Sequence, residues 1–490
     1  IVLVGGLLFA CHPAPTAQTS ETAPFFPDPS RTLPPPAQTR TARSAPTLTS
    51  TPPPSPTPTQ ATSLLVVQPS ALRGLTVPFW HTATGEAEAI LQGFTAEFNQ
   101  TNPWGIAVQP VSHAGLGALD EEVFLAQSEK RLPGLIAATT DQALRWEKNS
   151  FLLADLTPYL TDPVWGLSQT EQLDFYPSFW AQDLVQRSNG TGKLTSKRLG
   201  VPWYRSALVA FYNRTWAEEL GFRTFPDTPD QFRRQVCAAA QANRADQDVR
   251  NDGTGGWLVT RDPLLLVGWI HAFGGEITHV NGSEFTFQTP AAEDAVQYLA
   301  DLIAEGCAWS TEEQIPAEAF AARRALIWFG SLANLPQQQL AFEQAASDDQ
   351  WVVLPFPSAT GNQVVESYGS SLMVIKAEPA QELAAWIFSR WLLSAEKQAA
   401  WAEANGVFPV RAAALQQARL SVGQAPQWEQ ALVWLPKAHS EPALASWGVM
   451  RGVLSDALGQ VLSPGFQSSR AAALLIKLDQ IAAEVEANTP

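Results

Sequence analysis

Residues 201–213 read VPWYRSALVAFYN, and this stretch decides the fold. Its first part, Pro202 to Ser206, mixes aromatic rings with a cation and a hydroxyl group, whereas Ala207 to Tyr212 is an uninterrupted apolar and aromatic run. Such a run is typical of a strand that is buried on both faces. We therefore expect a strand that passes from one lobe of a two-lobed protein into the other, with its first half facing a ligand and its second half in a core.

The chain before this stretch alternates between strand and helix patterns. Three strands are expected, over Leu75–Trp80, Ile106–Val111 and Pro133–Ala138. Helices are expected between them, and this rhythm predicts an α/β lobe with a mostly parallel sheet flanked by helices. Ligands bind beyond the carboxyl ends of such strands. Trp80, His81, Asp141 and residues 203–206 should therefore lie along one edge.

Five further motifs follow one another along the chain. They are Pro78-Phe79-Trp80-His81, Phe98-Asn99, Gly330-Ser331-Leu332-Ala333-Asn334, Gly369-Ser370-Ser371-Leu372 and Gly406-Val407-Phe408-Pro409-Val410. With these motifs, the chain resembles the maltose-binding-protein-like family of extracellular solute-binding proteins. These proteins feed bacterial ABC importers for sugars and related solutes. The resemblance covers roughly residues 74 to 460. The motif sequences PFWH and GSLAN are most similar to those of the glycerol-3-phosphate-binding branch.

The resemblance implies a periplasmic-binding-protein-like fold with two lobes joined by a multi-strand hinge. It also implies a monomer that delivers a carbohydrate to the transmembrane subunits of an ABC permease, with no catalytic residue, cofactor or metal. The expected boundaries are 1–11 for a lipoprotein signal peptide, 12–70 for a tether, 71–206 and 328–370 for lobe 1, 207–327 and 371–428 for lobe 2, and 429–490 for C-terminal helices that pack across both lobes.

The first residues look like an export signal. Residues 1–10 are apolar or small, and Leu8-Phe9-Ala10-Cys11 is similar to a bacterial lipobox, in which the cysteine is acylated. Ten residues are too few to span a bilayer. We expect Cys11 to be the lipidation site, with the true start upstream of Ile1; the alternative is a stray thiol in a cleaved peptide. The protein would then be exported and held by lipid on the outer face of the cytoplasmic membrane.

A proline-rich segment follows the lipobox. Residues 12–60 contain 14 prolines in 49 positions, with few charges, so this stretch cannot bury enough apolar surface to fold and predicts a disordered tether. A Pro-rich ligand for a recognition domain is the alternative. The remaining chain fits two domains. The net charge of −16 without basic runs argues against nucleic acid and against a polybasic membrane patch.

Motifs for covalent or metal chemistry are incomplete. The six histidines form no metal-ligand pair on one helical face, and Gly-x-Ser-x-Gly is absent. Residues 189–195 depart from a phosphate loop at two required places, and residues 246–253 lack the spacing of a calcium loop. Cys237 and Cys307 could form a disulfide or stay as buried thiols.

Aromatic and polar residues at the expected strand ends are the candidate ligand contacts. Tryptophans there could stack on a sugar ring, although each could equally belong to a core. Polar groups would fix the orientation of the ligand. The candidates are Trp80, His81, Asp141, Trp203, Tyr204, Arg205, Ser206, Trp269, Trp328, Ser331, Tyr368, Gly369 and Phe408. His81 could instead be a structural histidine.

Departures from the glycerol-phosphate branch bear on the ligand. Leu116, Val407 and Ala443 stand where that branch has two tyrosines and an arginine, which favours an uncharged, larger sugar. The alternatives are a glycerol-3-phosphate or related polyol-phosphate binding protein, and a surface lipoprotein that binds or hydrolyses glycans, for which Asp141 and Glu86 are the nominated carboxylates. A lobed adhesin or signalling co-receptor is a third possibility.

Overall fold

The computed structural model describes residues 62–188, 194–280, 282–311, 314–421, 426–434 and 438–489. The described residues all belong to one compact unit, within residues 60–490. The expected signal peptide, the lipidation site Cys11 and most of the expected tether lie outside the described residues. None of the described helices combines the length and apolar character that a membrane crossing requires.

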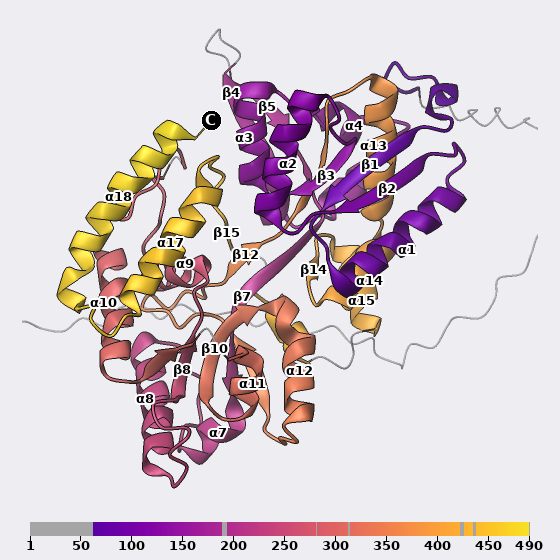
Figure 1. Cartoon of the computed structure of the whole chain (residues 1–490). Helices are drawn as coiled ribbons and strands as arrows, with labels where there is room; N and C mark the ends of the chain where they lie inside the picture. Colours follow the sequence, from indigo (N-terminus) through magenta and orange to yellow (C-terminus); the bar gives the residue numbers. More distant parts are fainter. Residues whose placement is uncertain are drawn as a thin grey trace, which may run out of the picture. The chain divides into compact units, whose positions relative to one another are not determined.

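The first lobe is built on a five-stranded sheet with the order β2-β1-β3-β13-β6 (Figure 1). Its strands are β1 (Thr76–His81), β2 (Ala107–Ser112), β3 (Leu135–Ala138), β6 (Val201–Pro202) and β13 (Ser371–Val374). The first three strands pair in parallel, whereas β13 runs antiparallel to both β3 and β6. The sheet is therefore mixed rather than wholly parallel.

Alternating side chains of the first sheet enter two cores. Val77 and Phe79 of β1 pack in one core, and Trp80 packs in another on the opposite face. The same alternation holds in β3, since Leu135 and Ile136 enter different cores. Helices cover these faces, namely α1 (Gly85–Thr101), α2 (Leu116–Glu129), α3 (Thr140–Ser150) and α13 (Pro379–Leu392).

The second lobe is built around the long strand β7 (Tyr204–Asn213). Its sheet has the order β15-β12-β7-β10-β8-β9, and β11 and β14 also pair with β7. The other strands are β8 (Gly255–Val259), β9 (Ala308–Ser310), β10 (Ala325–Ser331), β11 (Trp351–Leu354), β12 (Glu366–Tyr368), β14 (Phe408–Pro409) and β15 (His439–Ser440). Since β7 runs antiparallel to β10, β11, β12 and β14, this sheet is mixed as well.

Helices also cover the second sheet, and the shorter helices complete both lobes. The longer ones are α8 (Pro229–Ala245), α9 (Pro263–Ala272), α10 (Pro290–Ala304), α17 (Trp447–Val461) and α18 (Ala471–Asn488). The others are α4 (Thr157–Thr161), α5 (Gln169–Leu173), α6 (Pro177–Ala181), α7 (Arg214–Glu219), α11 (Pro316–Ala321), α12 (Leu335–Gln344), α14 (Ala395–Asn405), α15 (Ala412–Ser421) and α16 (Pro426–Leu432), and β4 (Leu184–Ser188) pairs with β5 (Leu194–Arg198) as a hairpin.

The two-lobed α/β architecture is confirmed, but strands β10, β12 and β13 belong to the lobe opposite to the one expected. We expected residues 328–370 in lobe 1, whereas β10 and β12 pair with β7 in the second sheet. We expected residues 371–428 in lobe 2, whereas β13 pairs with β3 in the first sheet. The chain changes sheets between β6 and β7, between β12 and β13, and between β13 and β14. A short apolar strand near such a crossing has the same pattern in either lobe, so only its pairing assigns it.

The expected tether also ends earlier than residue 70. The Oδ2 atom of Asp162 accepts hydrogen bonds from the Ser63 hydroxyl (2.8 Å) and from the Leu64 amide (2.7 Å). Leu65 and Val67 pack against the core that contains Phe79. Composition predicted a tether because prolines dominate up to residue 60, but residues 62–70 contain the apolar run that attaches to the first lobe.

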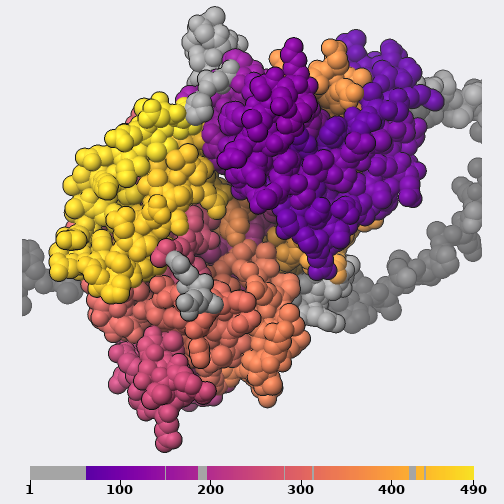
Figure 2. Space-filling view, viewed as in Figure 1, coloured from indigo at the N-terminus to yellow at the C-terminus, as the bar shows by residue number. Residues whose placement is uncertain are grey.

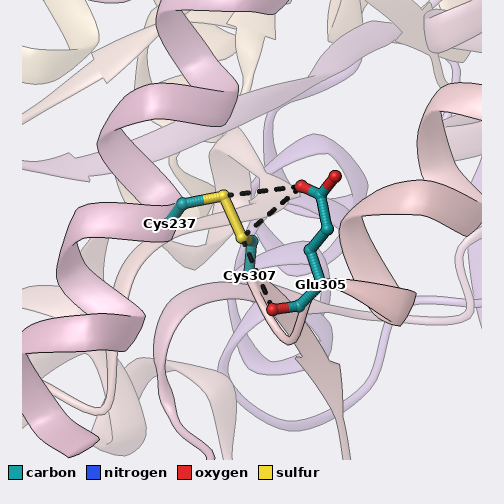
Figure 3. Close-up of side chains that lie close together, drawn as sticks. All are labelled: Cys237, Glu305 and Cys307. Atoms are coloured by element: carbon teal, nitrogen blue, oxygen red, sulfur yellow. Dashed lines mark hydrogen bonds between the residues drawn. A yellow bond between two sulfur atoms is a disulfide. The ribbon is translucent and has the colours of Figure 1, made fainter.

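A disulfide between Cys237 and Cys307 resolves the choice left open by the sequence. Cys237 lies on α8 and Cys307 follows α10, so the bond joins two helical segments of the second lobe (Figure 3). Glu305 lies beside the two sulfur atoms. Because both sulfurs are used in the disulfide, this group offers no thiolate to a metal ion.

Candidate functional site

Three hydroxyl groups meet where β7, β10 and β12 run side by side. Ser206 lies opposite Tyr368 in the antiparallel pairing of β7 with β12, and Ser331 ends the neighbouring strand β10. The hydroxyl oxygens of Ser206 and Ser331 are 2.9 Å apart. Burial raises the pKa of Tyr368, while hydrogen bonds with Ser331 and Ser206 oppose that rise. The three hydroxyls therefore form a small polar centre at the hinge.

Gly369 lets the hinge strands approach each other closely. A Cβ atom at this position would lie 2.3 Å from the carbonyl oxygen of Tyr204 and 3.0 Å from the Cα atom of Arg205. Its φ of +157° is also unfavourable for other residues. The close approach of the β7 backbone and the positive φ therefore both require glycine at this position of the hinge.

Arg205 is buried in the hinge, with 1 % of its surface exposed. Its Nη1 donates to the carbonyl oxygens of Tyr204 (2.8 Å) and Ser370 (2.9 Å). Its Nη2 donates to the Ser371 hydroxyl (3.1 Å), and its Nε donates to Gln182 (3.0 Å). The buried carboxylate that balances its charge belongs to Asp183, which lies 4.0 Å away and accepts from Ser371. Arg205 thus uses its donors to join the two lobes rather than offering them to a ligand.

Glu441 brings a carboxylate to the same region. It lies between β15 and α17, and 13 % of its side chain is exposed. The Nε1 of Trp447 donates to it over 2.9 Å, and Arg451 pairs with it. Burial raises the pKa of Glu441, Arg451 and Trp447 oppose the rise, and the charges of Asp141 and Asp262 add to it. Two other carboxylates are therefore close enough to influence Glu441.

The other two carboxylates stand at the starts of helices. Asp262 caps α9, where it accepts from the amide of Leu264 over 2.9 Å, and burial raises its pKa. Asp141 lies in the first turn of α3, is 5 % exposed and accepts from Nη1 of Arg145 over 3.0 Å. A carboxylate at a helix start is stabilised by the helix dipole.

The C-terminal segment contacts the first lobe next to Asp141. The Nη1 of Arg145 donates to the carbonyl oxygen of Ala445 over 2.9 Å, and Lys148 donates to the carbonyl oxygen of Thr489 over 2.6 Å. A Cβ atom on Gly448 would lie 2.9 Å from the Asp141 carboxylate, so α17 begins very close to α3. Figure 2 shows this contact, with the C-terminal segment in yellow beside the first lobe in purple.

We call Ser206, Asp262, Ser331, Tyr368 and Glu441 the hinge cluster. Hydroxyl groups both donate and accept hydrogen bonds, and ionised carboxylates accept only. The cluster can therefore bind a ligand rich in hydroxyl groups. A pocket of about 360 Å³ lies between α3, the β4–β5 hairpin and residues 443–445, and none of the hinge-cluster residues lines it.

Several candidate residues from the sequence lie together at the hinge. Phe408 pairs with Arg205 through β14, so Tyr204, Arg205, Ser206, Ser331, Tyr368, Gly369 and Phe408 belong to one region. Phe408 is fully buried, and Tyr204 packs edge to face with Trp203.

The candidate tryptophans are core residues in this structure. Trp203 stacks on Trp401 with ring centroids 4.5 Å apart, and Trp328 stacks on Phe211 at 4.6 Å. Trp269 is fully buried among the aromatic rings of the second lobe. Their burial leaves no ring face for a sugar, so the stacking role that we expected for these three does not fit their surroundings.

Trp80 and His81 end β1 and are also buried, at 6 % and 1 % exposure. Burial and the nearby His113 lower the pKa of His81 to about 4. Its Nδ1 atom is buried without a hydrogen-bond partner among the described residues. His81 is therefore a neutral imidazole whose Nδ1 atom makes no hydrogen bond with the described residues.

Asp183, Asp262, Glu441 and Arg451 were missed by the sequence analysis. The Asp-Pro pair at 262–263 is a helix-start signal that could have located Asp262. Glu441 carries no such signal, because its neighbours in space come from α3, α9 and α17.

Comparison with known proteins agrees with this architecture. Solved structures that are similar to the chain include three bacterial binding proteins. The cyclic alpha-maltosyl-1,6-maltose binding protein from Arthrobacter globiformis has a TM-score of 0.67 and 16 % identity, with 84 % of this chain and 100 % of that chain covered. UgpB from Mycobacterium tuberculosis, in complex with glycerophosphocholine, has a TM-score of 0.67 and 16 % identity, with 84 % and 98 % covered. The sugar-binding protein MalE from Xanthomonas citri has a TM-score of 0.66 and 19 % identity, with 84 % and 97 % covered.

No curated protein matches the chain. A model of the bacterial extracellular solute-binding protein family matches residues 94–431, which is more than half of the sequence. These residues include β2 to β14 and four of the five hinge-cluster residues, since Glu441 lies beyond residue 431. The chain belongs to the bacterial extracellular solute-binding proteins.

Proposed function

We propose that this protein captures a neutral carbohydrate at the hinge cluster and delivers it to the permease of an ABC importer. The observation that carries the proposal is the composition of the cluster, which combines three hydroxyls with carboxylates of raised pKa. Ligand hydroxyl groups would donate to Glu441 and Asp262 and exchange hydrogen bonds with Ser206, Ser331 and Tyr368. Hydrogen bonds to charged acceptors contribute about 1.5–3 kcal/mol each.

The charge around the cluster opposes an anionic ligand. The charges of Asp141 and Asp262 act on Glu441, so a phosphate group beside Glu441 would add to the repulsion there. Two nearby arginines are already paired, since Arg145 binds Asp141 and Arg451 binds Glu441. Arg205 already donates to four partners within the hinge. A phosphate needs cationic donors that are free to clamp it.

Neighbouring structures provide supporting context for a sugar and one contrary case. Two of them are described as binding proteins for maltose-derived sugars or for sugars in general, whereas UgpB was solved with glycerophosphocholine. A polyol phosphate or its choline ester is therefore the alternative ligand. The carboxylates of the hinge cluster could attract the choline cation, but they would repel the phosphate.

Binding can be tested by calorimetry on the full, tag-free chain. The panel contains neutral mono- and oligosaccharides, including maltose and maltotriose, together with glycerol 3-phosphate and glycerophosphocholine. We expect a micromolar or tighter dissociation constant for a neutral sugar, weakened by about 10- to 100-fold in Glu441→Gln because a charged acceptor is lost. The matched control is Glu484→Gln, which changes an exposed glutamate on α18 and should bind as the wild type does.

Tight binding of a phosphorylated ligand, without binding of any neutral sugar, would overturn the ligand assignment. The same sugars, incubated with the protein and assayed for new reducing ends, test the alternative of a glycan hydrolase. We expect no turnover, because the family consists of binding proteins.

Export and anchoring form a separate part of the proposal. The disulfide between Cys237 and Cys307 supports an oxidising compartment outside the cytoplasm. We assign the anchor to Cys11, where the apolar leader ends. Cys11→Ser should move the protein from the membrane fraction to the soluble fraction, and an unchanged membrane fraction would refute the anchor while leaving the binding proposal intact.

A further inference from the structure

A group of imidazole and carboxylate side chains lies beside β15, outside the hinge cluster. Nitrogen atoms of His271 and His439 and a carboxylate oxygen of Glu276 all lie within 4.8 Å of one another. The histidine rings stack with centroids 4.2 Å apart. We propose that His271, Glu276 and His439 bind a divalent transition-metal ion of the zinc type.

The local fold explains why these residues converge. His271 is in the last turn of α9, and the chain then turns through Gly274 and Gly275, whose amides donate to the carbonyl oxygens of His271 and Ile270. This turn brings Glu276 to 3.5 Å from Nε2 of His271. The end of a helix carries partial negative charge, which favours a bound cation.

His439 arrives from a distant part of the chain. It lies on β15, opposite Glu366 in the parallel pairing with β12. Glu366 is 2 % exposed and lies 2.7 Å from Nδ1 of His271. Because a carboxylate only accepts hydrogen bonds, Nδ1 is the donor. The Nε2 atom of His271 is thereby directed toward Glu276 and His439.

This arrangement has the features of a metal site with a carboxylate behind one ligand. Metal-binding histidines commonly donate their second ring N–H to a carboxylate, which fixes the orientation of the ring. Two imidazoles and one carboxylate favour zinc and related transition metals over magnesium and calcium, which prefer all-oxygen sites. The carboxylates of Glu276 and Glu366 would balance the charge of a divalent cation.

Two of the three ligands can adjust to the ion. Zinc–nitrogen distances are about 2.0–2.1 Å, so the ligand atoms must draw closer than they are here. The side chain of Glu276 is 69 % exposed, and His439 is half-buried. Their side chains can rotate toward the ion, whereas the buried His271 stays fixed. Solvent reaches the site from the Glu276 side.

Binding of zinc to the full, tag-free chain tests the proposal. After treatment with a chelator, titration with Zn²⁺ should show one saturable site per chain and a rise in melting temperature. Mg²⁺ and Ca²⁺ should produce neither effect. Co²⁺ should bind at the same site and give visible absorption bands typical of nitrogen ligation.

Variants distinguish a site from adventitious binding. His439→Ala and Glu276→Gln alter side chains outside the core, so both should fold, and each should weaken Zn²⁺ binding by at least about 10-fold. His279→Ala removes an exposed histidine from the same lobe and should bind as the wild type does.

The alternative is an ion pair in which a protonated His271 bridges Glu366 and Glu276 without a metal. In that case His439 is dispensable. The proposal is overturned if Zn²⁺ does not saturate one site, or if His439→Ala binds Zn²⁺ as tightly as the wild type.

Discussion

Arg205 and Glu441 both place a charge at the junction of the lobes, but they differ in how completely the protein satisfies it. Arg205 is 1 % exposed and donates to four partners on three segments of chain. Glu441 has Trp447 and Arg451 as partners, and two other carboxylates raise its pKa further. The charge of Arg205 is used in hydrogen bonds that hold the lobes together. The charge of Glu441 lies in an unfavourable environment, so we expect it to be available to a ligand. Gln182 links the two regions, because it accepts from Arg205 and donates to Ser440.

Removing Arg205 should have the largest effect on stability. Arg205→Met removes the buried cation that lies 4.0 Å from Asp183, and it removes one of the donors to the Ser370 carbonyl, which keeps the amide of Trp203. Breaking a buried pair in this way costs about 3–5 kcal/mol, and the loss is measured by urea unfolding at neutral pH. Arg214→Met is the matched control. Its ion pair with Glu218 is exposed, so it should cost less than about 1 kcal/mol. Equal losses in the two variants would contradict the structural role of Arg205.

His81 tests the effect of burying an imidazole whose Nδ1 atom has no hydrogen-bond partner among the described residues. Burial and His113 lower its pKa from 6.5 to about 4, so the unfolded chain binds a proton more readily than the folded one. The stability associated with His81 is therefore fully present above pH 6.5 and is lost as the pH falls toward 4. This loss amounts to roughly 3 kcal/mol.

His81→Gln should reduce the difference in unfolding free energy between pH 7.5 and pH 4.5. His279→Gln, at an exposed position, should leave that difference as in the wild type. A wild-type pH dependence in His81→Gln would show that the imidazole is not buried in its neutral form.

The sequence predicted the parts of this fold that depend on local pattern. The apolar run of β7 and the strands β1 and β3 follow from periodicity, because their side chains alternate between two cores. The lobe assignment of β10 and β13 did not follow, since both strands adjoin a crossing and their pattern is the same in either sheet. The candidate site was predicted less completely. Nine of the ten residues of α9 are buried, so no polar face distinguishes Trp269 from a ligand contact.

The hinge residues show where sequence reasoning stops. Tyr204 to Ser206 could be placed at the junction, but the sequence does not show whether a guanidinium group finds partners. Those of Arg205 come from Gln182 and from the Ser370–Ser371 turn. Glu441 could not be found because its environment forms only when α3, α9 and α17 meet.

Asp162 is an intermediate case, since part of its hydrogen bonding comes from the N-terminal segment. Deleting residues 12–61 should leave the melting temperature unchanged, because their composition cannot support a core. Extending the deletion through residue 70 removes the Ser63 and Leu64 donors and the packing of Leu65. This should cost about 1–2 kcal/mol. If the two deletions unfold alike, the attachment of residues 62–70 contributes nothing to stability.

Glu441 should show the smallest effect on stability. Burial raises its pKa, which means that the folded protein disfavours the ionised carboxylate, even though Arg451 and Trp447 partly offset that cost. Glutamine keeps an acceptor for Nε1 of Trp447 and removes the repulsion from Asp141 and Asp262. We therefore expect Glu441→Gln to change the unfolding free energy by less than about 1 kcal/mol, although it weakens sugar binding. A loss as large as that of Arg205→Met would place Glu441 among the groups that hold the lobes together. The contrast between the two charges would then disappear, because neither would be available to a ligand.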